Sequence, residues 1–171
     1  AGVDVPRYIR LIADSKYDEA LSVIRESIPF PSVCGYVCFH PCEAKCRRGQ
    51  LDEPVAIRAL KRFAADHARK VASGKPKVAS PSGKRVAVVG SGPAGVTAAY
   101  YLAQSYGPAV TVFEGLPEAG GMMRVGIPRY RLPKDVLDVE IEAIKQVGVE
   151  IKTNSRVDSI DSLRQQVYDA I

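Results

Sequence analysis

The chain has 171 residues, of which 46% are hydrophobic and 25% are charged, and its formal net charge is +5. These proportions are typical of a globular protein, and no apolar run approaches the roughly 20 residues of a membrane span. The first residues lack the apolar core and cleavage site of a signal peptide, so a cytoplasmic protein is expected. The basic residues are spread along the chain, which favours a solvated face or a surface for an acidic redox partner over a nucleic-acid site.

Residues 4–28 carry apolar side chains at helical spacing with a break near Ser15, so two short helices are predicted there. Asp4 suits the N-cap of the first helix, and Pro6 suits its first turn. A third helix is expected to begin at Pro54. The expected apolar stripes are Ile9, Ile12 and Ala13, then Ala20, Leu21 and Ile24, and finally Ala56, Leu60, Phe63, Ala64 and His67.

Residues 71–83 are rich in Gly, Pro, Ser and Lys, which is typical of an exposed linker. Beyond it, the segments KRVAVVG, AVTVFE and VEIKTN are predicted strands. Helices are expected after the first strand, from Pro133 to about Gly148, and over the final segment SLRQQVYDAI. This alternation predicts parallel strands with right-handed crossovers. The predicted fold class is α+β overall, with an all-α domain over residues 1–70 and a partial α/β Rossmann domain over residues 84–171.

A glycine-rich turn lies between the first of these strands and the helix that follows it. Gly90, Gly92 and Gly95 have the Gly-x-Gly-x-x-Gly spacing of dinucleotide-binding folds. The first glycine permits a tight turn, the second lets the backbone approach a pyrophosphate, and the third lets helix and strand pack closely. The pyrophosphate would lie at the helix N-terminus, whose free N–H groups favour anions.

Glu114 ends the second predicted strand, at about the distance of 20 residues at which such folds place an acidic residue. Its carboxylate would accept hydrogen bonds from the hydroxyls of an adenosine ribose. An acid at this position disfavours a 2′-phosphate, so NADP is a poor ligand for this pocket. The alternatives at this point are a glycine-rich turn without a ligand, an NAD site and an FAD site, since the motif serves both cofactors.

The segments GSGPAG, VTVFEGLPEAGGMMRVGIPRYRLP and VLDVEIEAIKQVGVEI together carry a specific resemblance. From about Lys84 to Val157 the chain resembles the FAD domain shared by the small subunit of NADPH-dependent glutamate synthase and the N-terminal part of dihydropyrimidine dehydrogenase. The resemblance implies FAD at this site and NAD(P)H in a separate domain. It implies phosphate contacts from Ser91, Gly92, Pro93, Ala94 and Gly95, a ribose contact from Glu114, flavin contacts near Gly121 and Met122, a cofactor contact from Arg131, and an adenine-side position for Val157.

Cys34, Cys38, Cys42 and Cys46 are the four cysteines of the chain, and each follows the last after four residues. Such clustering without export signals indicates metal binding rather than disulfides. A continuous helix would spread the thiols over about 18 Å, too far for one centre, so Gly35 and Pro41 are expected to break it. The spacing leaves a four-thiolate zinc site and iron–sulfur clusters open as alternatives.

The stretch CGYVCFHPCEAKCRRG with PVAIRALKRFAAD resembles the downstream half of the helical domain with two 4Fe–4S clusters in the same family. The resemblance implies that Cys38 and Cys42 serve one cluster and Cys46 the other, while the role of Cys34 is less defined. Some relatives place a non-cysteine ligand near the position of Lys61, where a lysine is a poor ligand. The family also has an upstream cysteine stretch, so full clusters are not expected from this chain alone.

The resemblance implies a fragment of a larger electron-transfer oxidoreductase in which FAD and iron–sulfur clusters pass electrons between NAD(P)H and a larger redox subunit or a second site. No residue has the pattern of a general acid, base or nucleophile. Weak or absent FAD binding, and no activity, are expected of the chain by itself. The rivals are a non-catalytic, zinc-stabilised nucleotide-binding and assembly module, which would contain zinc and no iron, and an NAD-linked dehydrogenase, which would contain no flavin.

Overall fold

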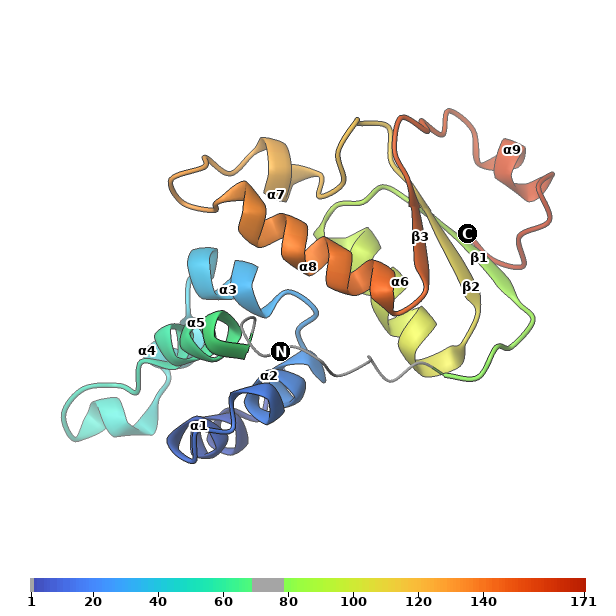
Figure 1. The fold of residues 1–171 in the computed structure, drawn as a ribbon. Helices are drawn as coiled ribbons and strands as arrows, with labels where there is room; N and C mark the ends of the chain where they lie inside the picture. The colour runs from blue at the N-terminus through green and yellow to red at the C-terminus, as the bar shows by residue number, and fades with distance from the viewer. Residues whose placement is uncertain (1, 69–78) are drawn as a thin grey trace. The chain divides into compact units, whose positions relative to one another are not determined.

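The computed structural model describes residues 2–68 and 79–171, which fall in two compact units, Ala1–Gly74 and Lys75–Ile171. Most of the predicted linker, residues 71–78, lies outside the described residues, and residues 79–83 form neither helix nor strand. The first unit is helical and the second holds a parallel sheet, which confirms the predicted α+β class (Figure 1). Among the described residues, every helix is too short or too polar to cross a membrane.

The described part of the first unit begins with the two predicted short helices. The side chain of Asp4 caps the first by accepting a hydrogen bond from the backbone N–H of Arg7 at 3.1 Å, and Pro6 lies in its first turn. Because the chain turns at Ser15, which has a positive φ of 59°, the second helix can pack back on the first. The elements are α1 (Val5–Ala13), α2 (Tyr17–Arg25), α3 (Pro31–Val37), α4 (Pro41–Ala44), the 3-10 helix η1 (Arg47–Gln50) and α5 (Ile57–Ala68).

Helices α1, α2 and α5 enclose the core of this unit, and two expected stripes need correction. In α1 the fully buried residue is Tyr8, whereas Ile9 and Ile12 are half-buried at its border and Ala13 is exposed. The hydroxyl of Tyr8 donates to the carbonyl of Ile57 at 3.0 Å, and this bond makes its burial possible.

Helix α5 begins at Ile57 rather than at Pro54, and the face that it buries differs from the expected one. Its buried residues are Ile57, Lys61, Ala64, Ala65 and Ala68, while Ala56 and Phe63 are exposed. Small alanine side chains let α5 approach its neighbours closely, and the wider aromatic side chains are left at the edge. There Phe63 and His67 pack on the ring of Tyr17, with centroid distances of 5.5 and 5.2 Å.

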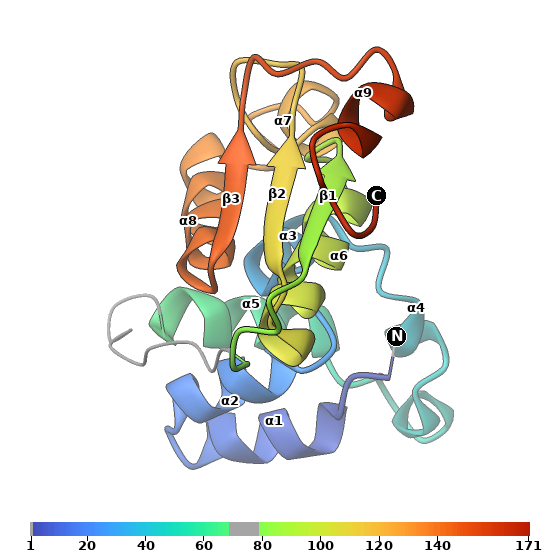
Figure 2. The same ribbon diagram turned by 90° about the vertical axis from the view of Figure 1, so that its right-hand side faces the viewer.

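The second unit is a three-stranded parallel sheet in the order β1-β2-β3, as the alternation of strands and helices predicted (Figure 2). Helices α6 and α8 lie on one face of this sheet (Figure 1). Their buried aliphatic side chains meet those of β2 and β3 in the core, where Val96, Val110, Val112, Leu137 and Ile144 are buried. The elements are β1 (Arg85–Val89), α6 (Pro93–Tyr106), β2 (Ala109–Phe113), α7 (Met122–Val125), α8 (Lys134–Gln146), β3 (Val149–Lys152) and α9 (Ile160–Arg164).

The last expected helix is wrong in its bounds. Helix α9 ends at Arg164, and the chain then returns along the outer edge of β1 (Figure 2). There the N–H of Asp169 donates to the carbonyl of Arg85 at 2.8 Å, and the N–H of Ala87 donates to the carbonyl of Ala170 at 2.9 Å. The free backbone groups of a strand edge favour this pairing over further helix. The β1 edge of the sheet is therefore partly paired.

Candidate functional site

The candidate site lies at the carboxyl ends of β1 and β2, where two glycine-containing loops meet. Gly90 follows β1 with a φ of +94°, which favours glycine. Gly92 is the N-cap of α6, and Pro93 and Ala94 form its exposed first turn. A Cβ added to Gly95 would lie 2.0 Å from the carbonyl oxygen of Gly90, so only glycine lets the helix approach the turn.

The space around Gly92 is open. Its φ is −65°, which any residue adopts, and a Cβ added there would meet no atom within 4 Å. The turn places this open backbone directly before a 14-residue helix, whose first N–H groups lack partners within the helix. A phosphate anion fits such a place, because the N–H groups and the helix dipole both favour negative charge. The backbone therefore has the form of a dinucleotide cradle.

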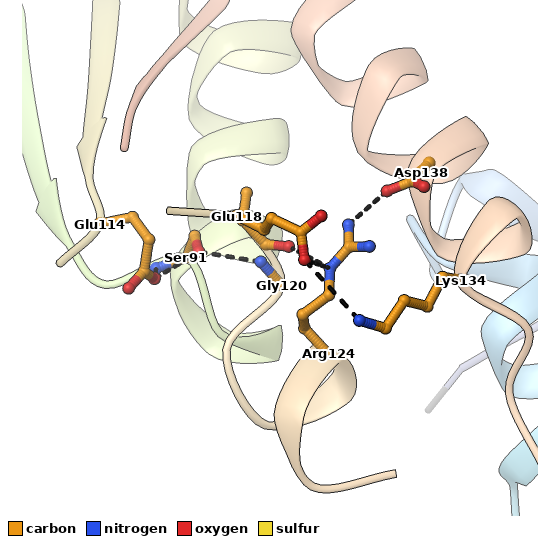
Figure 3. Close-up of polar contacts among 8 residues, drawn as sticks. Ser91, Glu114, Glu118, Gly120, Arg124, Lys134 and Asp138 are labelled. Atoms are coloured by element: carbon orange, nitrogen blue, oxygen red, sulfur yellow. Dashed lines mark hydrogen bonds and ion pairs between the residues drawn. The ribbon is translucent and has the colours of Figure 1, made fainter. Parts of the chain in front are cut away.

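Glu114 closes the inner side of this cradle and is buried (Figure 3). One of its carboxylate oxygens accepts from the N–H of Ser91 at 2.9 Å and from the Ser91 hydroxyl at 2.5 Å. The other accepts from the N–H of Leu116 at 2.8 Å. Burial works to raise the pKa of this carboxyl, but these bonds outweigh burial and lower it, so the group is ionised at neutral pH.

Ser91 is fully buried and lies between Glu114 and the second loop (Figure 3). Its hydroxyl oxygen accepts from the N–H of Gly120 at 2.9 Å while its own proton goes to Glu114. The backbone N–H of Ser91 is also taken by Glu114. In this arrangement Ser91 connects the two loops, whereas the expectation of a phosphate contact from Ser91 stays a prediction.

The second loop contributes a pair of glycines to the cradle. Gly121 has a φ of +50°, and a Cβ added to it would lie 2.7 Å from the Cα of Gly92. The backbones of the two loops are therefore in direct contact, which no larger residue at Gly121 would permit. Met122, the next residue, is 67% exposed beside this contact. The structure thus brings Gly121 and Met122 to the glycine turn at Gly92, and a flavin contact from either residue stays a prediction.

The two remaining expected contacts lie farther along the chain. Val157 is half-buried after β3, and the segment before it pairs with the loop that follows β2, since the N–H of Ser155 donates to the carbonyl of Glu114 at 2.7 Å. Arg131 is exposed, and its backbone N–H donates to the carbonyl of Pro128 at 2.9 Å. A cofactor contact from either residue stays a prediction.

The cysteine segment is the second candidate site, and none of its four cysteines forms a disulfide. Cys34 lies inside α3, Cys38 is the C-cap of that helix, Cys42 lies in α4, and Cys46 is the N-cap of η1. Within residues 2–68 and 79–171, no three His, Cys, Asp or Glu side chains come together as a metal site would require. The described residues therefore do not fit a complete cluster or a complete zinc site.

The expected helix breaks in this segment are half right. Pro41 does open a new helix, α4, in its first turn. Gly35, however, is buried within α3, which continues to Val37. A Cβ added to Gly35 would lie 2.7 Å from the Cβ of Arg62, so this glycine serves the close packing of α3 on α5. Chain reversal occurs at His40 instead, which has a φ of 47°.

Two of the thiols have polar backbone neighbours. Backbone N–H groups of Val55 first, then of Arg48 and Gly49, lower the pKa of Cys46. The N–H of His40 donates to the sulfur of Cys38 at 3.3 Å. The donors to Cys46 favour its thiolate, which is the form that ligates metals.

Comparison with known families agrees with both units. Residues 84–170 match the family described as pyridine nucleotide-disulphide oxidoreductase, and residues 1–73 match the one described as dihydropyrimidine dehydrogenase domain II, 4Fe-4S cluster. The chain belongs to the pyridine nucleotide-disulphide oxidoreductase family. This family and its accompanying domain confirm the expected cofactor classes, an iron–sulfur cluster for the first unit and a flavin for the second, with a pyridine nucleotide in related proteins.

Three curated relatives illustrate the range of proteins in which this pair of domains occurs. The beta subunit of NADP(+)-dependent formate dehydrogenase from Moorella thermoacetica is 48% identical over all of this chain and 27% of its own length. The beta subunit of NADPH-Fe(3+) oxidoreductase from Geobacter sulfurreducens is 44% identical over 100% of the chain and 26% of its length. The NADPH glutamate synthase small chain of Bacillus subtilis is 34% identical over 98% and 34%. The chain spans about a quarter of the length of the first two.

One residue beside the candidate site was not predicted from the sequence. Arg124 is buried in α7, only two residues beyond Met122, and forms ion pairs there. The sequence signal that could have indicated it is a single arginine between apolar residues. A charged side chain at such a position is buried only where other groups pair with it. Ser91 was expected at the site, but its bonds to Glu114 and Gly120 were not.

Proposed function

We propose that this chain is the FAD-binding and cysteine-bearing part of an NAD(P)H-dependent electron-transfer oxidoreductase. The observation that carries the proposal is the open backbone of Gly92 at the start of α6, faced by the glycine turn at Gly121. Two loops of this kind form a cradle for the pyrophosphate of a dinucleotide. FAD, when bound, would supply the redox chemistry, and the chain would supply binding and placement.

The assignment of this cradle to FAD rests on Glu114 and on the family. An ionised carboxylate beside the phosphate turn repels a 2′-phosphate, which disfavours NADP at this position. Gly92, Pro93, Ala94 and Gly95 would place the phosphates and Glu114 the ribose. NAD(P)H would then need a second site outside these residues, since the chain carries a single Gly-x-Gly-x-x-Gly motif.

The cysteines have a separate place in the proposal. Cys38, Cys42 and Cys46 would contribute thiolates to iron–sulfur clusters, and the match of residues 1–73 to a 4Fe–4S domain supports this. The lowered pKa of Cys46 supports it too, because a thiolate is the ligating form. The ligands do not converge within the described residues, so completed clusters would need ligands from elsewhere.

A larger partner subunit is part of the proposal, and its identity is left open. Two relatives are named as beta subunits and a third as a small chain, which supports assembly with a partner. The resemblance in the sequence suggested a role like that of the glutamate synthase small subunit. The relatives named for formate dehydrogenase and for Fe(3+) reduction are more similar in sequence, at 48% and 44% against 34%, so glutamate synthase is only one version of the proposal.

The test is an anaerobic absorption spectrum of the protein expressed from its complete gene, together with assays of iron, sulfide, zinc and flavin. We expect flavin bands over a broad iron–sulfur absorbance, both bleached by NADPH or NADH. Stoichiometric zinc without flavin would refute the proposal in favour of a zinc-stabilised assembly module. Bound NAD without flavin would refute it in favour of a simple dehydrogenase.

A further inference from the structure

Arg124 is a charged residue that the second unit buries beside the cradle. Its side chain is 6% exposed, although a guanidinium is among the groups most costly to remove from water. It lies in α7, directly after the glycine turn, and points toward α8 (Figure 3). There it forms an ion pair with the carboxylate of Asp138, and its Nε lies 3.9 Å from a carboxylate oxygen of Glu118.

The same side chain holds a backbone group of the glycine loop. The Nε of Arg124 donates to the carbonyl of Ala119 at 3.1 Å. The N–H of the very next residue, Gly120, donates to the hydroxyl oxygen of Ser91 at 2.9 Å. This carbonyl and this N–H belong to one peptide group, which is planar. Both polar groups of one peptide plane are therefore hydrogen-bonded, the carbonyl to Arg124 and the N–H to Ser91 (Figure 3).

This hydrogen-bonded peptide leads into the two glycines of the loop, whose backbone has the greatest conformational freedom. Gly120 and Gly121 have φ values of +124° and +50°, and glycine moves through this region at little cost. Their position decides the shape of the cradle, because Gly121 rests on the backbone of Gly92. A clamp on the peptide before them restricts where this second wall can lie.

We propose that Arg124 is a positioning residue for the bound dinucleotide: it clamps the peptide between Ala119 and Gly120 and so sets the wall of the cradle that faces the start of α6. The proposal rests on the assignment of that cradle to FAD. The geometry requires an arginine, because the planar guanidinium donates in two directions at once, to the carbonyl and to Asp138. A lysine keeps the charge but has no fixed fork of donors.

The partners of Arg124 differ in what their loss should do. The side chain of Asp138 is 58% exposed, so a neutral residue there leaves the guanidinium buried without its full counter-charge and holds it less firmly against the carbonyl of Ala119. Glu118 also pairs with Lys134, at 3.8 Å, so two cations, Arg124 and Lys134, hold the carboxylate of Glu118 in place. We therefore expect Asp138→Asn to be a milder copy of the Arg124 variants.

The first arm of the test measures hydrogen exchange in the protein expressed from its complete gene, after removal of flavin. In Arg124→Gln and Arg124→Lys, exchange of the Gly120 amide should rise by about fivefold, since the loss of one hydrogen bond is worth about 1 kcal/mol. Amides of β1 and β2 should exchange as in the wild type, which a merely structural role would not predict. Arg164→Gln, which changes an exposed arginine of α9, is the matched control. If Arg124→Gln loosened the strands as well, Asp138→Asn would provide the milder comparison.

The second arm measures the dissociation constant for FAD in the protein expressed from its complete gene. Arg124→Gln and Arg124→Lys should both weaken FAD by about tenfold, with Arg164→Gln unchanged. Wild-type affinity in Arg124→Lys would show that charge alone suffices, and unchanged Gly120 exchange would show that no clamp exists; either result overturns the positioning role. Faster exchange with unchanged FAD affinity would overturn it too. A wild-type protein that binds no FAD would instead refute the proposed function itself.

Discussion

The two units build their candidate sites in different ways. In the second unit the cradle consists mainly of backbone, and its glycine turns at Gly92 and Gly121 come into contact within one continuous segment. In the first unit the candidate ligands are side chains, and Cys34, Cys38, Cys42 and Cys46 lie on three different short elements without converging. A site made of backbone can be specified by a short run of glycines. A site made of side chains needs several segments to close around it.

The glycines of the two units also differ in their purpose, because some permit close packing and one leaves open space. At Gly95 and Gly35 an added Cβ would collide with protein atoms at 2.0 and 2.7 Å, so these glycines serve packing. At Gly92, the second glycine of the motif, an added Cβ would meet no atom within 4 Å, and the φ of this residue is one that any residue adopts. Space left open at a glycine that packing does not require indicates a place for a ligand. The comparison yields four predictions.

The largest effect is expected at Gly95. Gly95→Ala should destabilise the second unit by about 3 kcal/mol, because the methyl group would force α6 away from the Gly90 carbonyl. Thermal unfolding followed by circular dichroism should show a lower transition for this unit and an unchanged one for the helical unit. Gly92→Ala is the matched control, with wild-type unfolding but weaker FAD binding. Equal loss of stability in both variants would contradict the distinction between packing and ligand glycines.

The second prediction applies the same reasoning to the cysteine-bearing unit. In Gly35→Ala the methyl group would meet the backbone and side chain of Arg62, at a cost of about 3 kcal/mol. Alanine in place of glycine within a helix returns about 1 kcal/mol, so a net loss of about 2 kcal/mol is expected in urea unfolding. Gly49→Ala, whose methyl group would meet only Pro54 at 3.7 Å, should be tolerated. A stable Gly35→Ala chain would show that α3 and α5 can separate without loss.

The third prediction concerns pH and the carboxylate of Glu114. Its pKa is lowered in the folded chain, so its contribution to stability is complete above the ordinary carboxyl pKa of about 4.5 and is lost as the pH falls through the lowered value. The melting temperature of the second unit should therefore drop between about pH 5 and pH 3. In Glu114→Gln this drop should be smaller. Parallel curves for the two proteins would mean that other carboxyl groups govern the acid transition.

The smallest effect is expected at Tyr8. Burial raises the pKa of Tyr8, so its hydroxyl stays protonated and donates to the carbonyl of Ile57. Tyr8→Phe should lower the free energy of unfolding of the helical unit by about 1 kcal/mol, the usual value of one hydrogen bond. Tyr106→Phe is a control, because Tyr106 is 71% exposed in the other unit. No difference between these variants would show that the buried hydroxyl contributes nothing.

Strong periodicity and glycine chemistry made much of the fold predictable. The caps of α1, the strands around the glycine turn and the parallel sheet all follow from local patterns, and the structure confirms them. Predictions failed where packing chose between similar faces. In α5 both Phe63 and Ala65 lie on apolar positions, and the packing of α2 on α5 decided between them: Ala65 is buried in one cluster with Leu21, whereas Phe63 is exposed.

The sequence by itself determined the place of the glycine turn before α6, since Gly90, Gly92 and Gly95 act through their own backbone and through residues next to them. It also determined Glu114 as the acid at the end of β2. Only the tertiary structure decided that Ser91 would connect Glu114 to Gly120 and that Arg124 would be buried against Asp138. Local spacing describes neighbours within a few residues, whereas these bonds join loops and helices 14 to 29 residues apart, which meet only when the sheet and its helices pack.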